Sequence, residues 1–266
     1  MRMLMFALVA AVMASITTTC ADPEANPSDG RAVDLTPAPI PEFADAEVTR
    51  IYRAMGQAQG SLEAWGRARY LTFDFVVRRD EGDFRRSHEW DRWGGRAQVT
   101  WASDEGETVA VVDSKDPTQG QVWVAGEAVP AGPHADSLLM QAYRAHINDA
   151  YWLVMPFKWA DPGVHARFLG KETAEDGRIF DVVELSFDGV GVTPDNMYHA
   201  YVNTETGLME RWAHYSTPDA EPRFAEWGGY EEIGPLRLAL DKGRIQFENV
   251  RVLEGELPDG AFALPN

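Results

Sequence analysis

The chain has 266 residues, of which 45% are hydrophobic, and its formal net charge is -18. Nucleic acids and anionic lipid surfaces attract basic patches, so this acidic balance excludes both as main partners. The hydrophobic content supports a sizeable core, and the length fits one large domain. The only cysteine, Cys20, excludes an intramolecular disulfide.

The first twenty residues have the three parts of a secretion signal. Arg2 supplies a positive charge, residues 4–16 form an apolar run, and small residues follow at 17–19. The run is shorter than the roughly 20 residues of a transmembrane helix. A buried helix is the alternative, but the polar, proline-rich stretch at 21–41 could not pack behind it. We predict a signal peptide at 1–20 and an exported protein.

Cys20 stands where bacterial lipoproteins are cut and lipidated. Their signals normally carry a Leu-like residue three positions earlier and Gly, Ala or Ser just before the cysteine, where this chain has Thr17 and Thr19. Asp22 adds an acidic residue of the kind that accompanies inner-membrane retention. Two alternatives stay open: a lipid anchor at Cys20, or ordinary cleavage near Ala21 that leaves a soluble periplasmic protein.

Residues 21–44 read as a disordered tether, with five prolines and little that can pack. Helix signals follow, because Asp45 can cap a segment that ends at Gly56 and Gly60. One face of this helix carries Val48, Ile51, Tyr52 and Met55. A second short turn spans residues 61–65.

From Tyr70 the hydrophobic period changes to two, which is typical of strands. Leu71, Phe73, Phe75 and Val77 share one face. Further alternating segments lie at 87–93, 97–101, 107–113 and 121–129. A spacing of about ten residues, with turn residues between, indicates an antiparallel meander.

A helical segment at 137–146 interrupts the meander, and an aromatic segment at 148–164, closed by two prolines, follows it. Strands resume at 164–172, 179–187, 197–203, 208–215, 223–233, 236–243 and 245–255. Residues 203–207 predict a hairpin turn. The tail at 257–265 is expected to tuck Phe262 under a sheet edge.

No catalytic motif is recognisable: the chain has no nucleophile elbow, no phosphate-binding loop and no zinc-protease motif. No two of the six histidines lie two or four positions apart, so there is no local metal pair. We predict no catalytic residue, no metal and no cofactor.

Two groups of polar residues are candidate sites. His88 and Arg92 share a strand face with Trp90, either as the polar lining of a barrel or, the interpretation we favour, as a solvated face with aromatic packing. Arg144, His146, Asn148 and Asp149 form the second group. It is either a binding site or, as favoured, a buried network that fixes the crossing from helix to strand.

The aromatic, one-faced strands need a cover. Full cover by helices makes that face a core, whereas partial cover leaves a cavity for an apolar ligand. The sequence does not separate these two outcomes. The candidate cavity residues are Leu71, Phe73, Phe75, Val99, Trp101, Trp152, Met155 and Phe157.

The order of elements resembles the LolA/LolB-like half-barrel superfamily. Local similarity to uncharacterised exported members of this group lies at 54–65, 147–164, 201–212 and 247–262. The resemblance implies one mainly β (α+β) domain at 45–266: a curved antiparallel sheet forming an incomplete barrel, with an N-terminal helix and a short helical insertion on its concave face. It also implies a gating arginine, for which Arg69, Arg92 and Arg144 are candidates.

The function we predict is a non-enzymatic cell-envelope protein that binds a lipid or lipoprotein acyl chain in a half-barrel cavity. Two alternatives remain. The chain could be an enzyme of unrecognised type that acts on an envelope substrate through His88, His146 or nearby carboxylates, or a structural or interaction module without a cavity. We expect no nucleic-acid partner, and contact with the membrane only through an anchor at Cys20.

Overall fold

The computed structural model describes residues 42–189, 191–193 and 195–264. The predicted signal peptide, Cys20 and the tether up to residue 41 lie outside these residues. By their contacts, the described residues form one compact unit. No helix among them is both long and apolar enough to cross a membrane.

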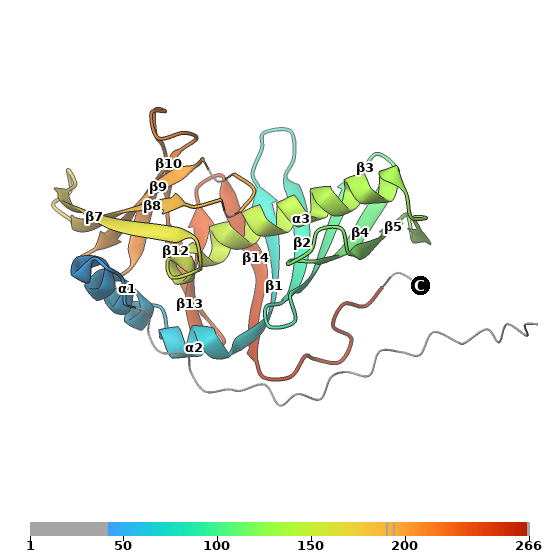
Figure 1. Ribbon diagram of the computed structural model, residues 1–266, viewed down its shortest axis with the longest axis horizontal. Helices are drawn as coiled ribbons and strands as arrows, with labels where there is room; N and C mark the ends of the chain where they lie inside the picture. The colour runs from blue at the N-terminus through green and yellow to red at the C-terminus, as the bar shows by residue number, and fades with distance from the viewer. Residues whose placement is uncertain (1–41, 190, 194, 265–266) are drawn as a thin grey trace, which may run out of the picture. The chain divides into compact units, whose positions relative to one another are not determined.

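The larger of the two sheets has nine antiparallel strands and joins the two halves of the chain (Figure 1). The last long strand, β14, pairs with the first, β1, across the middle of this sheet. Its strands, in spatial order, are β12 (Gly228–Ile233), β13 (Leu236–Lys242), β14 (Ile245–Glu254), β1 (Ala68–Val77), β2 (Phe84–Asp91), β3 (Arg96–Ser103), β4 (Gly106–Asp113), β5 (Gly120–Val124) and β6 (Glu127–Ala128).

The smaller sheet has five antiparallel strands. In spatial order they are β11 (Arg223–Glu226), β10 (Met209–Tyr215), β9 (Met197–Asn203), β8 (Ile179–Phe187) and β7 (Val164–Thr173). Among the described strands neither sheet closes on itself, so the predicted mainly β, antiparallel and incomplete architecture is confirmed.

The sequence predicted one continuous sheet, whereas the structure has two. The division falls at Trp227, inside the segment predicted as one strand. Before it, β11 pairs with β10; after it, β12 pairs with β13. At this break the Trp227 side chain is buried against the rings of Trp152 and Trp212.

The helix α1 (Ala46–Ala58) forms as its sequence pattern predicts. Asp45 accepts a hydrogen bond from the Glu47 amide at 2.9 Å, and the four residues of the predicted apolar face are buried. The helix continues past Gly56. Phe43, which we assigned to the tether, packs edge-on against Tyr52 at 5.3 Å between ring centroids.

A short helix, α2 (Leu62–Arg67), follows where a turn was predicted. Ser61 caps it by accepting a hydrogen bond from the Ala64 amide at 3.0 Å. The helix leads directly into β1 and therefore fixes the start of the larger sheet.

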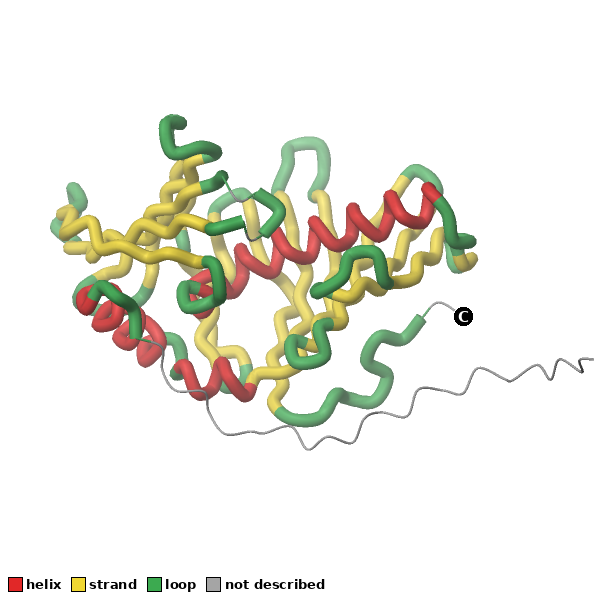
Figure 2. Tube along the Cα trace, viewed as in Figure 1, coloured by secondary structure: helices red, strands yellow, loops and turns green. Residues whose placement is uncertain are grey.

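The helix α3 (Pro133–Val154) is far longer than the predicted segment at 137–146, and it continues into the 3-10 turn η1 (Met155–Lys158). It crosses one face of the larger sheet (Figures 1 and 2). The first part of α3 packs on β3, β4 and β5, and its last turns pack on β1, β13 and β14.

A glycine allows the close approach of α3 to the sheet. A side chain at Gly120 would place its Cβ 2.3 Å from the Val111 carbonyl oxygen and 2.6 Å from Leu139 of α3. The position therefore tolerates no larger residue without a shift of strand or helix.

The structure tests two local predictions in the C-terminal part of the chain, and it confirms the hairpin turn. Asn203 closes the hairpin between β9 and β10, its side chain accepting hydrogen bonds from the amides of Glu205 and Thr206. Phe262 is buried against Tyr70, and its amide donates to Glu89 at 2.7 Å. The tail is thereby fastened to β1 and β2, which are interior strands of the larger sheet, so Phe262 is buried as predicted but does not lie under a sheet edge.

Candidate functional site

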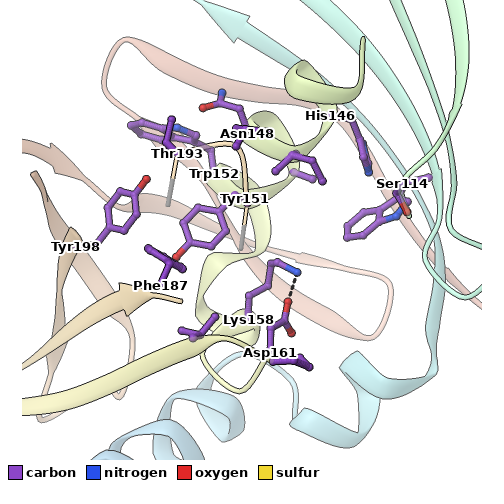
Figure 3. Close-up of a pocket in the computed structure, with 17 residues that line it drawn as sticks. Ser114, His146, Asn148, Tyr151, Trp152, Lys158, Asp161, Phe187, Thr193 and Tyr198 are labelled. Atoms are coloured by element: carbon purple, nitrogen blue, oxygen red, sulfur yellow. Dashed lines mark hydrogen bonds and ion pairs between the residues drawn. The ribbon is translucent and has the colours of Figure 1, made fainter. Parts of the chain in front are cut away.

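The candidate site is a pocket of about 320 Å³ beside the C-terminal half of α3 (Figure 3). Its walls come from the last turns of α3, the segment 158–164, the facing ends of β8 and β9, and one side of β2. The described residues that line it are Trp90, Ser114, His146, Ile147, Asn148, Ala150, Tyr151, Trp152, Lys158, Asp161, Pro162, Val164, Phe187, Gly191, Val192, Thr193 and Tyr198.

One side of the pocket is aromatic. Tyr151, Phe187 and Tyr198 contact one another, with ring centroids 5.6 to 6.1 Å apart. Trp152 packs edge-on against Trp212 of the smaller sheet at 4.3 Å. Aromatic rings of this kind offer a large apolar surface to a ligand.

The floor of the pocket carries one ion pair, in which Lys158 donates to the carboxylate of Asp161 (Figure 3). Burial raises the pKa of the Tyr151 phenol well above its usual value, and the charge of Asp161 adds to this. The phenol is therefore neutral at physiological pH, and the opposite charges of Lys158 and Asp161 balance each other.

His146 of α3 forms part of the opposite wall. It is 1% exposed, its ring lies edge-on to Trp90 at 5.1 Å, and its Nδ1 atom has no hydrogen-bond partner among the described residues. Burial, with a contribution from His88, lowers the pKa of His146 to about 3. The ring is neutral, and a buried polar atom without a partner costs about 1–3 kcal/mol.

Behind this wall lies a buried carboxylate that already accepts four hydrogen bonds. Asp149 is fully buried and accepts two hydrogen bonds from Arg86, at 2.6 and 2.7 Å. The Nε2 atom of His88 donates to it at 2.9 Å, and the amide of Asn148 donates at 2.8 Å. Burial alone would raise the pKa of Asp149, but the bonds from His88 and Arg86 outweigh it and lower the pKa.

The structure thus favours the interpretation of the second polar group as a buried network. Asp149 joins α3 to β2, and its carboxylate is not available to bind a ligand. Arg144 points elsewhere, because its side chain is exposed on α3. Within that group, only His146 and Asn148 line the pocket.

The favoured interpretation of the first polar group was wrong. The face that His88 and Trp90 share is packed against α3 and is not solvated; His88 is 2% exposed and its ring stacks on Phe73 at 4.6 Å. The prediction failed because the alternation of the strand does not reveal that a helix carrying Asp149 covers this face.

Sequence reasoning missed Arg86. The predicted strand began at residue 87, whereas β2 begins at Phe84. In a strand, residues two apart share a face, so an earlier start would have aligned Arg86 with His88 and Trp90. The signal was therefore available in the strand's alternation.

The candidate gating arginines occupy different environments. Arg69 makes an ion pair with Asp91 at 3.0 Å. Arg92 lies 3.3 Å over the Trp65 ring and donates to the carbonyl oxygens of Trp65 and Ala68 at the end of α2. Burial lowers the pKa of Arg92 to about 10, so it stays charged at neutral pH.

Of the eight predicted cavity residues, only Trp152 lines the pocket. The other seven belong to the buried core clusters under α3 and α1. The alternation correctly identified an inward face, but α3 covers much of it. The seven are Leu71, Phe73, Phe75, Val99, Trp101, Met155 and Phe157.

Among the described residues no group of three or more His, Cys, Asp or Glu side chains is arranged to hold a metal ion. The prediction that the chain needs no cofactor stays a prediction.

No protein-family model matches the chain, and no curated protein matches it in sequence. Its structure is similar to a LolA superfamily protein from Nitrosomonas europaea, at 11% identity and a TM-score of 0.44, over 80% of this chain and 96% of that one. It is also similar to a DUF1329 family protein from Desulfovibrio piger, at 14% identity and a TM-score of 0.43, over 80% and 94% of the two chains.

Proposed function

We propose that this chain is a non-enzymatic binding protein of the cell envelope, and that it holds the apolar chain of a lipid in the pocket beside α3. The observation that carries the proposal is the aromatic wall of Tyr151, Phe187 and Tyr198, which faces an open space instead of filling it. A concave, largely apolar site with a few polar groups is the usual form of a small-molecule site.

The size of the pocket limits the ligand. A volume of about 320 Å³ lies at the small end of ligand sites, which span roughly 300–1,000 Å³. It suits a single chain better than several. Each buried methylene group contributes about 0.8 kcal/mol, so eight of them contribute about 6 kcal/mol before the costs of association.

The proposal includes no covalent step. An enzyme would need a reactive group exposed to the pocket, but the carboxylate of Asp149 is saturated by its three partners and fully buried. His88 is likewise engaged by Asp149 and does not line the pocket. His146 does line the pocket, but burial lowers its pKa to about 3, which makes it a poor proton acceptor at neutral pH. The arrangement therefore supports binding better than acid–base catalysis.

Among the three candidate arginines, we propose Arg92 for the gating role. It connects the end of α2 to β2 through carbonyl oxygens and the Trp65 ring, and Trp65 itself stacks on Phe157 at 4.8 Å. We propose that this contact holds α2 closed over the adjoining core.

A fluorescence measurement tests the proposed function. The uncharged probe N-phenyl-1-naphthylamine is titrated into the full chain and into two variants. Val164→Trp places a large ring in the pocket wall, whereas His165→Trp places the same ring one position along β7, on the exposed side. We expect binding by wild type and H165W and a loss of at least tenfold in V164W. Equal binding by all three would contradict the proposed site.

Export and anchoring are proposed on the sequence alone, since Cys20 lies outside the described residues. The test labels cells that express wild type or Cys20→Ser with a lipid precursor and compares the label on the two proteins. Loss of label and of membrane association would establish the anchor, whereas unlabelled, soluble protein in both would leave cleavage near Ala21.

A further inference from the structure

Resting on the proposed function, we propose that the ligand is a single-chain amphiphile with an uncharged, hydrogen-bonding head, and that His146 binds this head. The chain would lie against the aromatic wall, and a hydroxyl group would lie at the opposite wall. This names both the class of the ligand and its orientation in the pocket.

The pocket has two unlike sides. Tyr198 and Phe187 lie on one side of it, whereas His146 and Ser114 lie on the other, with Lys158 and Asp161 between them at the floor (Figure 3). A ligand that spans the pocket therefore meets an apolar end and a polar end, which is the pattern of an amphiphile.

His146 has unused hydrogen-bonding capacity. A neutral imidazole has one donor and one acceptor in either tautomer. The residue is 1% exposed, and its Nδ1 atom has no partner among the described residues, although the side chain lines the pocket. Nδ1 is closed off from the pocket as the ring stands, so a ligand's polar atom would reach it only after the ring turned its Nδ1 edge toward the pocket. Buried polar groups are normally paired, and the hydrogen bond gained would favour that turn.

The charges around this wall are already balanced. Lys158 is paired with Asp161, and Asp149 behind the wall is paired with Arg86. Arg92 carries a charge nearby, but the Trp65 ring and the carbonyl oxygens of α2 cover it, and it does not line the pocket.

A charged head would therefore find no free counter-ion at this wall. A carboxylate or an ammonium group would lose its hydration without gaining a partner, which is costly. A hydroxyl group can both donate and accept, so it matches the neutral His146 ring. This favours an uncharged head over an anionic or a cationic one.

The test displaces bound N-phenyl-1-naphthylamine with four probes that share an eight-carbon tail: 1-octanol, 1-chlorooctane, octanoate and octyltrimethylammonium. Chlorooctane is the control for hydrophobicity, because it is the more apolar of the two uncharged probes. We expect octanol to displace the naphthylamine at a concentration at least tenfold lower than each of the other three.

Two variants assign this preference to His146. His146→Phe keeps a ring but removes the hydrogen bond, and His134→Phe changes an exposed histidine away from the pocket. We expect H146F to lose the preference for octanol over chlorooctane and H134F to keep it. His146→Gln, which retains a donor and an acceptor, should keep part of it. If H146F does not fold, two other results test the proposal. They are the relative displacement by octanol and chlorooctane in wild type, and the same comparison in the Gln variant.

The outcomes are distinct. The head-group proposal is overturned if chlorooctane displaces the naphthylamine best, or if H146F still prefers octanol to chlorooctane. Either result leaves the proposal of apolar binding intact. A best displacement by octanoate or by the ammonium probe also overturns it, in favour of a charged ligand. Failure of the naphthylamine to bind at all overturns the proposed function as well.

Discussion

The guanidinium of Arg86 on β2 donates two hydrogen bonds, at 2.6 and 2.7 Å, to the fully buried carboxylate of Asp149 on α3. This contact joins the helix to the sheet behind the pocket, and the Nε2 atom of His88 completes it. Removing one partner of a buried pair leaves the other charge without compensation. The contact should therefore control the position of α3.

Asp149→Ala should lower the free energy of unfolding by about 3–5 kcal/mol, because Arg86 and His88 would lose their common acceptor. Urea unfolding followed by circular dichroism measures the change. The control is Glu47→Ala, which breaks an exposed pair with Arg50 and should cost at most about 1 kcal/mol. Equal effects of the two substitutions would show that the buried network does not fix the helix.

His146 should make the protein less stable in mild acid. Its pKa is about 3 when folded, compared with roughly 6.5 when unfolded, so the unfolded chain binds an extra proton below pH 6.5. Stability is thus full above pH 6.5 and falls by about 1.4 kcal/mol per pH unit below it. The lowered pKa of Asp149 adds its own loss only below about pH 3.9.

The measurement compares the free energy of unfolding of wild type and His146→Phe at about pH 6.5 and pH 5.5. Wild type should lose about 1 kcal/mol more than the variant over this interval. Parallel pH profiles would mean that His146 is accessible to protons in the folded protein, and so is not buried as described.

Arg92→Ala should loosen α2. The substitution removes the donor to the carbonyl oxygens of Trp65 and Ala68 and the cation above the Trp65 ring. Hydrogen exchange should rise in residues 61–68 while α1 stays protected. Arg69→Ala, which breaks the ion pair with Asp91, is the control. If exchange in α2 rises equally in both variants, Arg92 has no special role at this helix.

Lys242 at the end of β13 is an unusual buried amine. Its Nζ atom donates to the Ala239 carbonyl oxygen at 2.6 Å and lies 3.8 Å from the centre of the Trp227 ring, and burial lowers the pKa of Lys242 well below its usual value. Folding therefore opposes protonation of this group, and stability is lost as the pH falls below the unfolded value of about 10.4.

Lys242→Met should raise the free energy of unfolding at pH 7 by about 1 kcal/mol or more, because the apolar side chain removes this penalty. Thermal unfolding checks it, with the exposed Lys115→Met as a control that should change little. A lower melting temperature for K242M would show that the contact with Trp227 outweighs the cost of burial.

Local periodicity predicted much of the fold. The spacing of Val48, Ile51 and Met55 placed the apolar face of α1, and alternation placed Leu71 and Phe73 on the inner face of β1. These features depend on neighbours in sequence, which is why they can be read from it.

The features that the sequence did not reveal depend on distant partners. The predicted helix stopped at His146 because polar residues interrupt its apolar stripe, yet Asp149 is buried on that stripe through Arg86 and His88. The break at Trp227 likewise depends on which strands pair on each side of it. The covering of Phe73 and Val99 by α3 could not be predicted, since alternation does not say what faces a strand.

Native mass spectrometry of the full chain purified from cell envelopes without detergent tests the central claim most directly. The account predicts a population of wild type that carries one bound amphiphile of a single mass, present in His165→Trp and absent from Val164→Trp. Unbound protein in all three samples, together with no binding of the naphthylamine probe, would contradict the account.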